Sequence, residues 1–208
     1  MWKMETKVRL GILGSGKGSN MVALAEACRK GELEAEIAQV VSDIDGAGIL
    51  ARAGNFGIAA TFLAPGAFRT KLDEESEQNY IRIFKEANVD LIVLAGFMRI
   101  LKGDFLKAFP NRVINIHPSL LPSFPGLEAW KQALDYGVKF TGCTVHFVDQ
   151  GIDTGPIILQ ETVPALDVDT PQTLHERIQE AEHRLYPAAI RLAIEGDLRV
   201  RGRLCGRA

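Results

Sequence analysis

The chain has 208 residues, of which 47% are hydrophobic and 24% charged, and its formal net charge is −2. This length supports one sizeable core and predicts one domain, while the near-neutral charge gives no electrostatic footprint for nucleic acid. No apolar stretch approaches the ~18 residues of a membrane span. Cys28, Cys143 and Cys205 lack any paired spacing, which favours neither disulfides nor a zinc site. We therefore expect a cytoplasmic protein.

Apolar runs bounded by turn residues alternate with helical patterns over the first two thirds of the chain. In chain order we expect a strand at 7–13 (KVRLGIL), a helix at 21–30 (MVALAEACRK), a strand at 35–43 (AEIAQVVSD), a helix at 48–55 (GILARAGN), a third helix ending at 80–88 (YIRIFKEAN), strands at 89–97 (VDLIVLAGF) and 112–117 (RVINIH), and a helix at 127–137 (LEAWKQALDYG). Alternation of this kind predicts a doubly wound, parallel α/β sheet.

The pattern changes after Gly137. The alternating TGCTVHFVD and the following GPIILQETV predict paired, more antiparallel strands. Thr170 is expected to cap the last helix, with Pro171 at its first position. The tail LRVRGRLCGRA is interpreted as a solvated terminus. The sequence therefore predicts a single α/β domain, mostly parallel, with an antiparallel C-terminal portion.

The glycine-rich stretch GILGSGKGSN lies between the first strand and its helix. Residues 11–17 fit the start of a P-loop, but Gly18 stands where a Ser or Thr hydroxyl is needed, and the dinucleotide spacing is also missed. The turn still exposes backbone N–H groups at a positive helix end, with Ser19 and Asn20 as added donors and Lys17 as a nearby cation. We expect it to bind a phosphate monoester; the alternative is a structural turn.

The stretch NIHPSLLPSFPG places Asn115 and His117 on one face of a strand that Pro118 ends. Asp153, in DQGIDTGP, lies between two expected strands in a glycine-flanked loop that can fold against another backbone. A carboxylate near His117 would favour the charged imidazole, and Asn115 could donate to an oxygen that becomes charged in a transition state. These three residue types suit acyl transfer without a covalent enzyme intermediate.

Other polar residues favour simpler interpretations. His146, in TVHFV, is interpreted as structural, and His175 and His183 are too far apart for a metal pair at helical spacing. The serines of SLLPS lack the nucleophile-elbow pattern, and Cys143 is expected to be a small buried side chain.

The stretches GSGKGSN, LAGFMRIL, NIHPSLLPSFPG, GCTVHFVDQGIDTGPIILQ and QEAEHRLYP, spread over about residues 8–198, together resemble the 10-formyltetrahydrofolate-dependent formyltransferase family. The short chain with GSGKGSN is similar to its purine-biosynthetic branch. That resemblance implies the formyltransferase fold and transfer of a formyl group from 10-formyltetrahydrofolate to the glycine amine of N1-(5-phosphoribosyl)glycinamide. The products would be the formyl-ribonucleotide and tetrahydrofolate, in de novo purine (IMP) biosynthesis.

The resemblance also implies roles for individual residues. His117 would be the proton donor, Asn115 the oxyanion partner, and Asp153 the residue that holds and charges the histidine. Ribonucleotide contacts are expected at Gly18, Ser19, Asn20, Gln179 and Glu182. Folate contacts are expected at Lys71, Met98, Arg99, Ile100, Leu101 and Asn115. The phosphoribosyl half would span about residues 1–100, and the folate-binding and catalytic half about 90–198.

The sequence departs from relatives of that family at Lys17, where Asn is familiar, and at Gln150 and Gly151 in the folate-side loop. The expected partners are two small-molecule substrates, with folate a consumed cosubstrate, no metal, no nucleic acid and no membrane, in a monomer or homodimer. Alternatives are formyltetrahydrofolate hydrolase and methionyl-tRNA formyltransferase, which we expect to carry an extra domain, a sugar-nucleotide formyltransferase, and a non-catalytic folate-binding domain.

Overall fold

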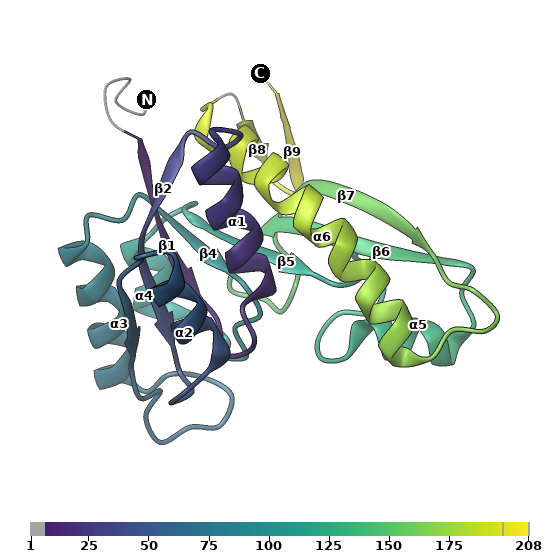
Figure 1. Cartoon of the computed structure of the whole chain (residues 1–208), viewed down its shortest axis with the longest axis horizontal. Coiled ribbons are helices and arrows are strands. Elements are labelled where there is room, and N and C mark those ends of the chain that lie inside the picture. Colours follow the sequence, from purple (N-terminus) through teal and green to yellow (C-terminus); the bar gives the residue numbers. More distant parts are fainter. Residues whose placement is uncertain (1–6, 197, 208) are drawn as a thin grey trace. The chain divides into compact units, whose positions relative to one another are not determined.

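The computed structural model describes residues 7–196 and 198–207, and the chain divides into two compact units, 1–114 and 115–208. The first contains β1 (Val8–Leu13), α1 (Ser19–Lys30), β2 (Ala35–Ser42), α2 (Gly48–Asn55), β3 (Ala60–Phe62), α3 (Glu74–Glu86), β4 (Leu91–Leu94) and α4 (Gly103–Ala108). Strand β5 (Val113–His117) contains the boundary. The second contains α5 (Ala129–Tyr136), β6 (Phe140–Phe147), β7 (Ile157–Pro164), α6 (Pro171–Ile194), β8 (Leu198–Arg201) and β9 (Leu204–Arg207) (Figure 1).

The sheet order confirms the expected fold class. In the described part of the chain, seven strands follow the order β3-β2-β1-β4-β5-β6-β7, and β8 and β9 form a separate pair. β1 pairs in parallel with both β2 and β4, and β2 pairs in parallel with β3. In such a doubly wound order, ligands bind at the carboxyl ends of the strands beside the point where the order reverses, which here is the β1/β4 pair.

The core of the first unit forms around Phe84 on α3. Its ring meets those of Phe105 and Phe109 edge-on, with centroids 6.4 Å apart in each case. Asp73 caps helix α3, since its carboxylate accepts a hydrogen bond from the Ser76 N–H, and the first turn of the helix is acidic, as the helix dipole favours. The ring of Phe84 lies against β1 at Gly11, where any side chain would collide with it.

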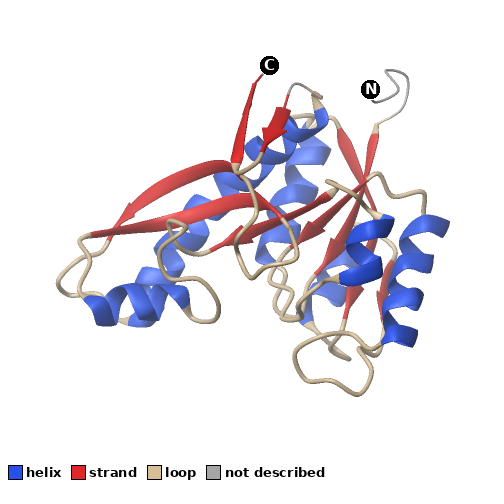
Figure 2. Cartoon of the chain, turned by 180° about the vertical axis from the view of Figure 1, so that it is seen from behind, coloured by secondary structure: helices blue, strands red, loops and turns tan. Residues whose placement is uncertain are grey.

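The second unit is built on the antiparallel pair β6 and β7, in register from Phe140 opposite Pro164 to Val145 opposite Leu159, with a register shift before His146. Helix α6 packs on both strands and runs along them in both views (Figure 2). Thr170 caps α6 in a capping box with Thr173, and Pro follows at the first helical position, as expected from the sequence.

The tail is largely exposed, as expected, but it contains two strands that were not predicted. Residues 198–201 and 204–207 form the antiparallel pair β8 and β9, although most of their side chains are exposed. The sequence analysis also missed β3 and α4, which have three and six residues. Elements this short carry too few residues to show a period.

We predict that Gly11→Ala lowers the free energy of unfolding by about 1–3 kcal/mol, the usual cost of overpacking a core. An added Cβ would lie 2.6 Å from Phe84 Cδ1 and 2.9 Å from Val89 Cγ1. Combining it with Phe84→Leu should cost less than the sum of the single losses, because the smaller side chain makes room. Urea denaturation of the four proteins measures this; additive losses would contradict it.

Candidate active site

Asn115 and His117 lie at the end of β5, which ends at His117 immediately before Pro118. His117 is 4% exposed and Asn115 is half-buried. The chain turns at once, since the Ser119 N–H donates to the His117 carbonyl at 2.9 Å. The strand end therefore holds an amide and an imidazole where β5 gives way to a loop, as the sequence predicts.

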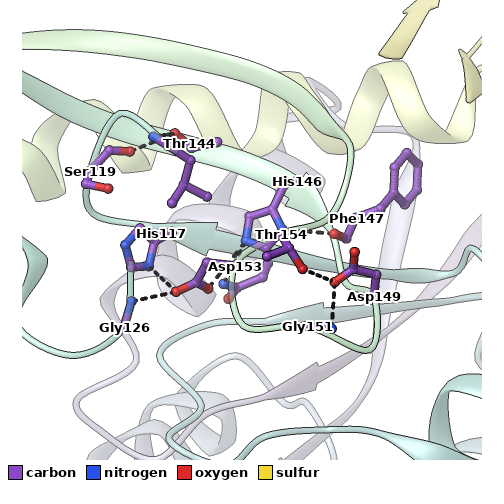
Figure 3. Close-up of polar contacts among 12 residues, drawn as sticks. His117, Ser119, Gly126, Thr144, His146, Phe147, Asp149, Gly151, Asp153 and Thr154 are labelled. Atoms are coloured by element: carbon purple, nitrogen blue, oxygen red, sulfur yellow. Dashed lines mark hydrogen bonds and ion pairs between the residues drawn. The ribbon is translucent and has the colours of Figure 1, made fainter. Parts of the chain in front are cut away.

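Asp153 lies in the link between β6 and β7 and reaches His117. Its Oδ2 lies 3.4 Å from His117 Nδ1 and accepts a hydrogen bond from the Gly126 N–H at 2.8 Å (Figure 3). Its φ of 53° is in the left-handed region, which a residue with a side chain rarely adopts. The structure thus contains the contact between the loop carboxylate and the strand-end histidine that the sequence predicts.

The link is shaped by its own hydrogen bonds. Asp149 Oδ1 accepts from the Gly151 N–H at 3.0 Å and from Thr154 Oγ1 at 2.7 Å. At Gly155 an added Cβ would lie 1.7 Å from the Phe147 carbonyl oxygen, so the backbone approach requires glycine there. These contacts fold the link tightly and place Asp153 in its position.

The second ring nitrogen of His117 also meets a protein acceptor. His117 Nε2 lies 2.9 Å from the Phe124 carbonyl oxygen. A carbonyl can only accept, so Nε2 carries a hydrogen in this arrangement, and Nδ1 faces a carboxylate. The imidazole can satisfy both acceptors at once only in its charged form.

His146, interpreted from the sequence as structural, contacts the site directly. Its Nδ1 donates to the Phe147 carbonyl at 2.9 Å, so its Nε2 is an acceptor and takes a hydrogen bond from Asn115 Nδ2 at 3.2 Å. Burial lowers the pKa of His146, which keeps the ring neutral. His146 Nε2 also lies 3.8 Å from Asp153 Oδ1. The ring therefore fixes which end of the Asn115 amide faces it.

A further network, also missed from the sequence, holds the loop after β5. Thr144 Oγ1 donates to the Ser119 carbonyl at 2.7 Å and accepts from the Leu121 N–H at 3.0 Å. Gln160 Nε2 donates to Thr144 Oγ1 and to the Leu121 carbonyl, both at 2.9 Å. Because Ser119 Oγ donates to carbonyls at the far end of this loop, the network positions the segment that supplies the Phe124 oxygen to His117.

The glycine loop follows β1 in the first unit. Gly18 is the N-cap of α1, with a φ of 81°, and an added Cβ would lie 2.7 Å from Ile49 Cγ1. Having no side chain, Gly18 gives no capping bond to the first turn of α1, which begins at Ser19. The turn thus has a structural need for glycine, and the N-terminus of a helix is also where backbone N–H groups favour an anion.

The expected folate segment, residues 98–101, follows β4. The Met98 N–H donates to Ser15 Oγ and the Ile100 N–H to the Thr70 carbonyl, each at 2.9 Å. Lys71 and Ile100 form an isolated parallel bridge. Since these two N–H groups already have protein acceptors, a ligand bound at this segment would use its other groups.

Gln179 and Glu182 lie on α6. Glu182 is buried, and Gln179 Nε2 lies 3.3 Å from His175 Nε2. The His175 ring stacks on Trp130 with centroids 3.7 Å apart.

Burial, with the negative charges of Glu182 and Glu161, raises the pKa of Cys143 to about 12. Cys143 is therefore a buried thiol, as expected.

The described residues, 7–196 and 198–207, hold no group of three or more His, Cys, Asp or Glu side chains placed to bind a metal ion. Over the same ranges, no helix combines the length and the apolar character needed to cross a membrane.

The chain matches known proteins over most of its length. Residues 8–190 match the family model described as formyl transferase. The trifunctional purine biosynthetic protein adenosine-3 of Gallus gallus is 44% identical over 206 residues, which are 98% of this chain and 20% of that protein. The chain thus spans about a fifth of the length of such relatives.

Relatives of similar length also match. The phosphoribosylglycinamide formyltransferase of Bacillus subtilis is 39% identical over 183 residues, covering 88% of this chain and 93% of that protein. The crystal structure of glycinamide ribonucleotide transformylase 1 from Symbiobacterium toebii has a TM-score of 0.93 and 46% identity, covering 100% of this chain and 97% of that one.

We predict that the stability of the protein falls as the pH drops below about 6.5, the ordinary pKa of histidine. Burial lowers the pKa of His146 and of His183, so the unfolded chain binds more protons in this range and unfolding is favoured. His146→Phe should flatten the slope of unfolding free energy against pH between about 5 and 7, with His183 keeping part of it. Denaturation across this range measures the slope; a slope equal to that of the wild type would contradict the prediction.

Proposed function

The chain belongs to the formyl transferase family, and on that premise we propose that it transfers the formyl group of 10-formyltetrahydrofolate to the amine of N1-(5-phosphoribosyl)glycinamide. The observation that carries the proposal is the contact of Asp153 with His117 beside Asn115, in a chain that matches a phosphoribosylglycinamide formyltransferase over 93% of that relative's length. The reaction belongs to purine biosynthesis, as the names of the relatives support.

In the proposed reaction, the ribonucleotide amine attacks the formyl carbon and the carbonyl electrons move to the formyl oxygen. Asn115 stabilises that oxyanion. Its amide has two hydrogens on Nδ2; one is bonded to His146 Nε2, which leaves the other for the developing charge. Because His146 holds the amide in this orientation before the substrate arrives, no reorganisation is needed when the charge appears.

His117 is the proposed proton donor. The intermediate collapses by breaking the bond between the formyl carbon and the folate nitrogen. That nitrogen leaves with a proton from His117 as tetrahydrofolate, and the attacking amine loses one proton, so the reaction moves one proton from the amine to the folate nitrogen overall. A charged His117, with both ring nitrogens on acceptors, holds the required proton. To deliver it from Nε2, the ring exchanges the Phe124 carbonyl for the reacting group. Asp153 holds the ring in its orientation throughout.

The remaining assignments concern binding. The glycine loop and the N-terminus of α1 suit the phosphate, because backbone N–H groups and the helix dipole favour an anion there. We assign ribonucleotide contacts to Gly18, Ser19, Asn20, Gln179 and Glu182. We assign folate contacts to Lys71, Met98, Arg99, Ile100, Leu101 and Asn115. The phosphoribosyl half is about residues 1–100 and the folate-binding and catalytic half about 90–198.

The proposal also includes the setting of the reaction. 10-Formyltetrahydrofolate is a consumed cosubstrate, the protein works in the cytoplasm on small molecules without a metal, and it is a monomer or homodimer.

The proposed function is tested by incubating the purified chain with 10-formyltetrahydrofolate and following tetrahydrofolate. Three reactions are compared: with the glycinamide ribonucleotide, with an amino-sugar nucleotide, and with water alone. Turnover that depends on the glycinamide ribonucleotide is expected. Equal turnover in water would identify a hydrolase, turnover with the sugar nucleotide would identify a different acceptor, and binding without turnover would indicate a non-catalytic domain.

We expect Asp153→Asn to lower kcat by roughly 10²-fold or more, the range of a positioned acid–base group. The substitution keeps the shape but removes the charge 3.4 Å from His117 Nδ1. KM for both substrates should change much less, because the lost interaction matters in the transition state. Asp167→Asn is the matched control, since Asp167 pairs with Lys139 at an exposed site. Near-normal turnover by Asp153→Asn would remove Asp153 from the mechanism.

Gly16→Val should raise the KM of the ribonucleotide far more than that of the folate. An added Cβ at Gly16 has no atom within 4 Å, so the side chain extends into the space assigned to the phosphate without disturbing the packing. Gly18 is a poorer test site, because a side chain there meets Ile49. Gly54→Val, at another open glycine, is the control. Steady-state kinetics decide; equal increases in both KM values would contradict the phosphate assignment.

A further inference from the structure

Three loops that follow β1, β2 and β4 meet at one side chain, that of Ser15. The Ser15 N–H donates to the Gly96 carbonyl at 3.0 Å. Its hydroxyl donates to Asp43 Oδ1 at 2.5 Å and accepts from the Met98 N–H at 2.9 Å. The hydroxyl therefore joins a carboxylate after β2 to the main chain after β4, and Ser15 itself belongs to the glycine loop after β1.

Asp43 is bound on its second oxygen as well. Its Oδ2 accepts from Arg99 Nε at 2.7 Å, and the two side chains are 1% and 14% exposed. An ion pair so well shielded from water is poorly screened by salt, and removing one partner leaves a buried charge without compensation. Asp43 thus fixes both the Ser15 hydroxyl and the Arg99 guanidinium.

Arg99 extends the network to the loop before Lys71. Its Nη1 donates to the Phe68 carbonyl at 2.8 Å and to the Arg69 carbonyl. A continuous set of polar contacts therefore runs from the glycine loop through Ser15, Asp43 and Arg99. It ends at the carbonyls of the loop before Lys71. The Arg99 side chain is used within the protein.

The glycine loop and the segment after β4 also pack too closely to move independently. An added Cβ at Gly14 would lie 2.8 Å from the Ala95 carbonyl oxygen, and the Ala95 N–H donates to the Leu13 carbonyl at 2.7 Å. Ser15 is the next residue after Gly14, so any shift of the glycine loop is transmitted to the Met98 N–H.

We propose that Ser15 is a positioning residue that couples the phosphate-binding loop to the folate-binding segment, so that each substrate binds more tightly when the other is bound. The inference rests on the proposed function, because residues 16–20 and 98–101 are assigned to the two substrates there. A phosphate held by the loop orders Ser15, and Ser15 orders the Met98 main chain. The effect on the two affinities is reciprocal. A hydroxyl suits this position because it donates and accepts at once.

The test measures the dissociation constant of tetrahydrofolate with and without saturating N1-(5-phosphoribosyl)glycinamide, a pair that cannot react. Wild type should bind tetrahydrofolate about 5-fold or more tightly when the ribonucleotide is present, the lower end of typical coupling. In Ser15→Ala this ratio should fall toward one. Ser15→Thr, which keeps the hydroxyl, should retain it, a rescue that a purely structural role for the side chain volume would not give.

Two further variants keep the test decisive. Asp43→Asn presents an amide where Arg99 and Ser15 need acceptors, so it should also reduce the ratio, and it replaces Ser15→Ala if that variant does not fold. Arg69→Ala is the control, because Arg69 contributes its carbonyl oxygen and its side chain is exposed. Its ratio should equal that of wild type.

The outcomes separate this inference from the proposed function. A wild type that turns over both substrates but shows a ratio of one, or a Ser15→Ala variant with the wild-type ratio, overturns the coupling alone. A wild type that neither binds tetrahydrofolate nor turns over overturns both.

Discussion

The contact between Asp153 and His117 is the interaction on which the proposed chemistry depends. The contact persists although the left-handed backbone conformation of Asp153 costs about 1–3 kcal/mol of strain. Such strain persists only where surrounding contacts determine the backbone. Here they do so from two sides, because the turn at Asp149 fixes the link and the Gly126 N–H binds the carboxylate. The antiparallel pairing of β6 and β7 sets the ends of that link.

In the first unit, hydrogen bonds likewise hold together segments that are distant in the sequence. Its parallel strands β1, β2 and β4 end at one edge, where loops from distant parts of the chain must be held together. Backbone hydrogen bonds join the strands themselves, and past their ends side chains share this task with bonds such as that from the Ser15 N–H to the Gly96 carbonyl. Ser15, Asp43 and Arg99 do so with a short hydroxyl, a buried carboxylate and a long guanidinium, each making more than one hydrogen bond.

Local signals in the sequence were sufficient for much of this structure. The apolar run of β4, the helical pattern of α1 and the Thr170–Pro171 start of α6 each depend on a few adjacent residues, and each prediction was confirmed. The pairing of Asp153 with His117 was also predicted, because a glycine-flanked carboxylate and a strand-end histidine are recognisable separately. Contacts that depend on the register between strands could not be predicted from the sequence. The bond between Asn115 and His146 spans 31 residues and exists only because β6 brings His146 to that height. The ion pair of Asp43 with Arg99 was not predicted either, since nothing in the sequence indicates that Asp43 would take the guanidinium.

The end of the Asn115 amide that faces His146 depends on whether the His146 ring is protonated. While the His146 ring is neutral, its Nε2 is an acceptor and draws the NH2 end of the amide toward it. A second proton on the ring would convert Nε2 to a donor, and the amide would satisfy it best by turning its carbonyl oxygen inward. The group positioned beside His117 would then present a different face to a bound molecule. Burial lowers the pKa of His146 and so keeps its ring neutral in mildly acidic conditions. The Asn115 amide therefore keeps the same orientation under those conditions.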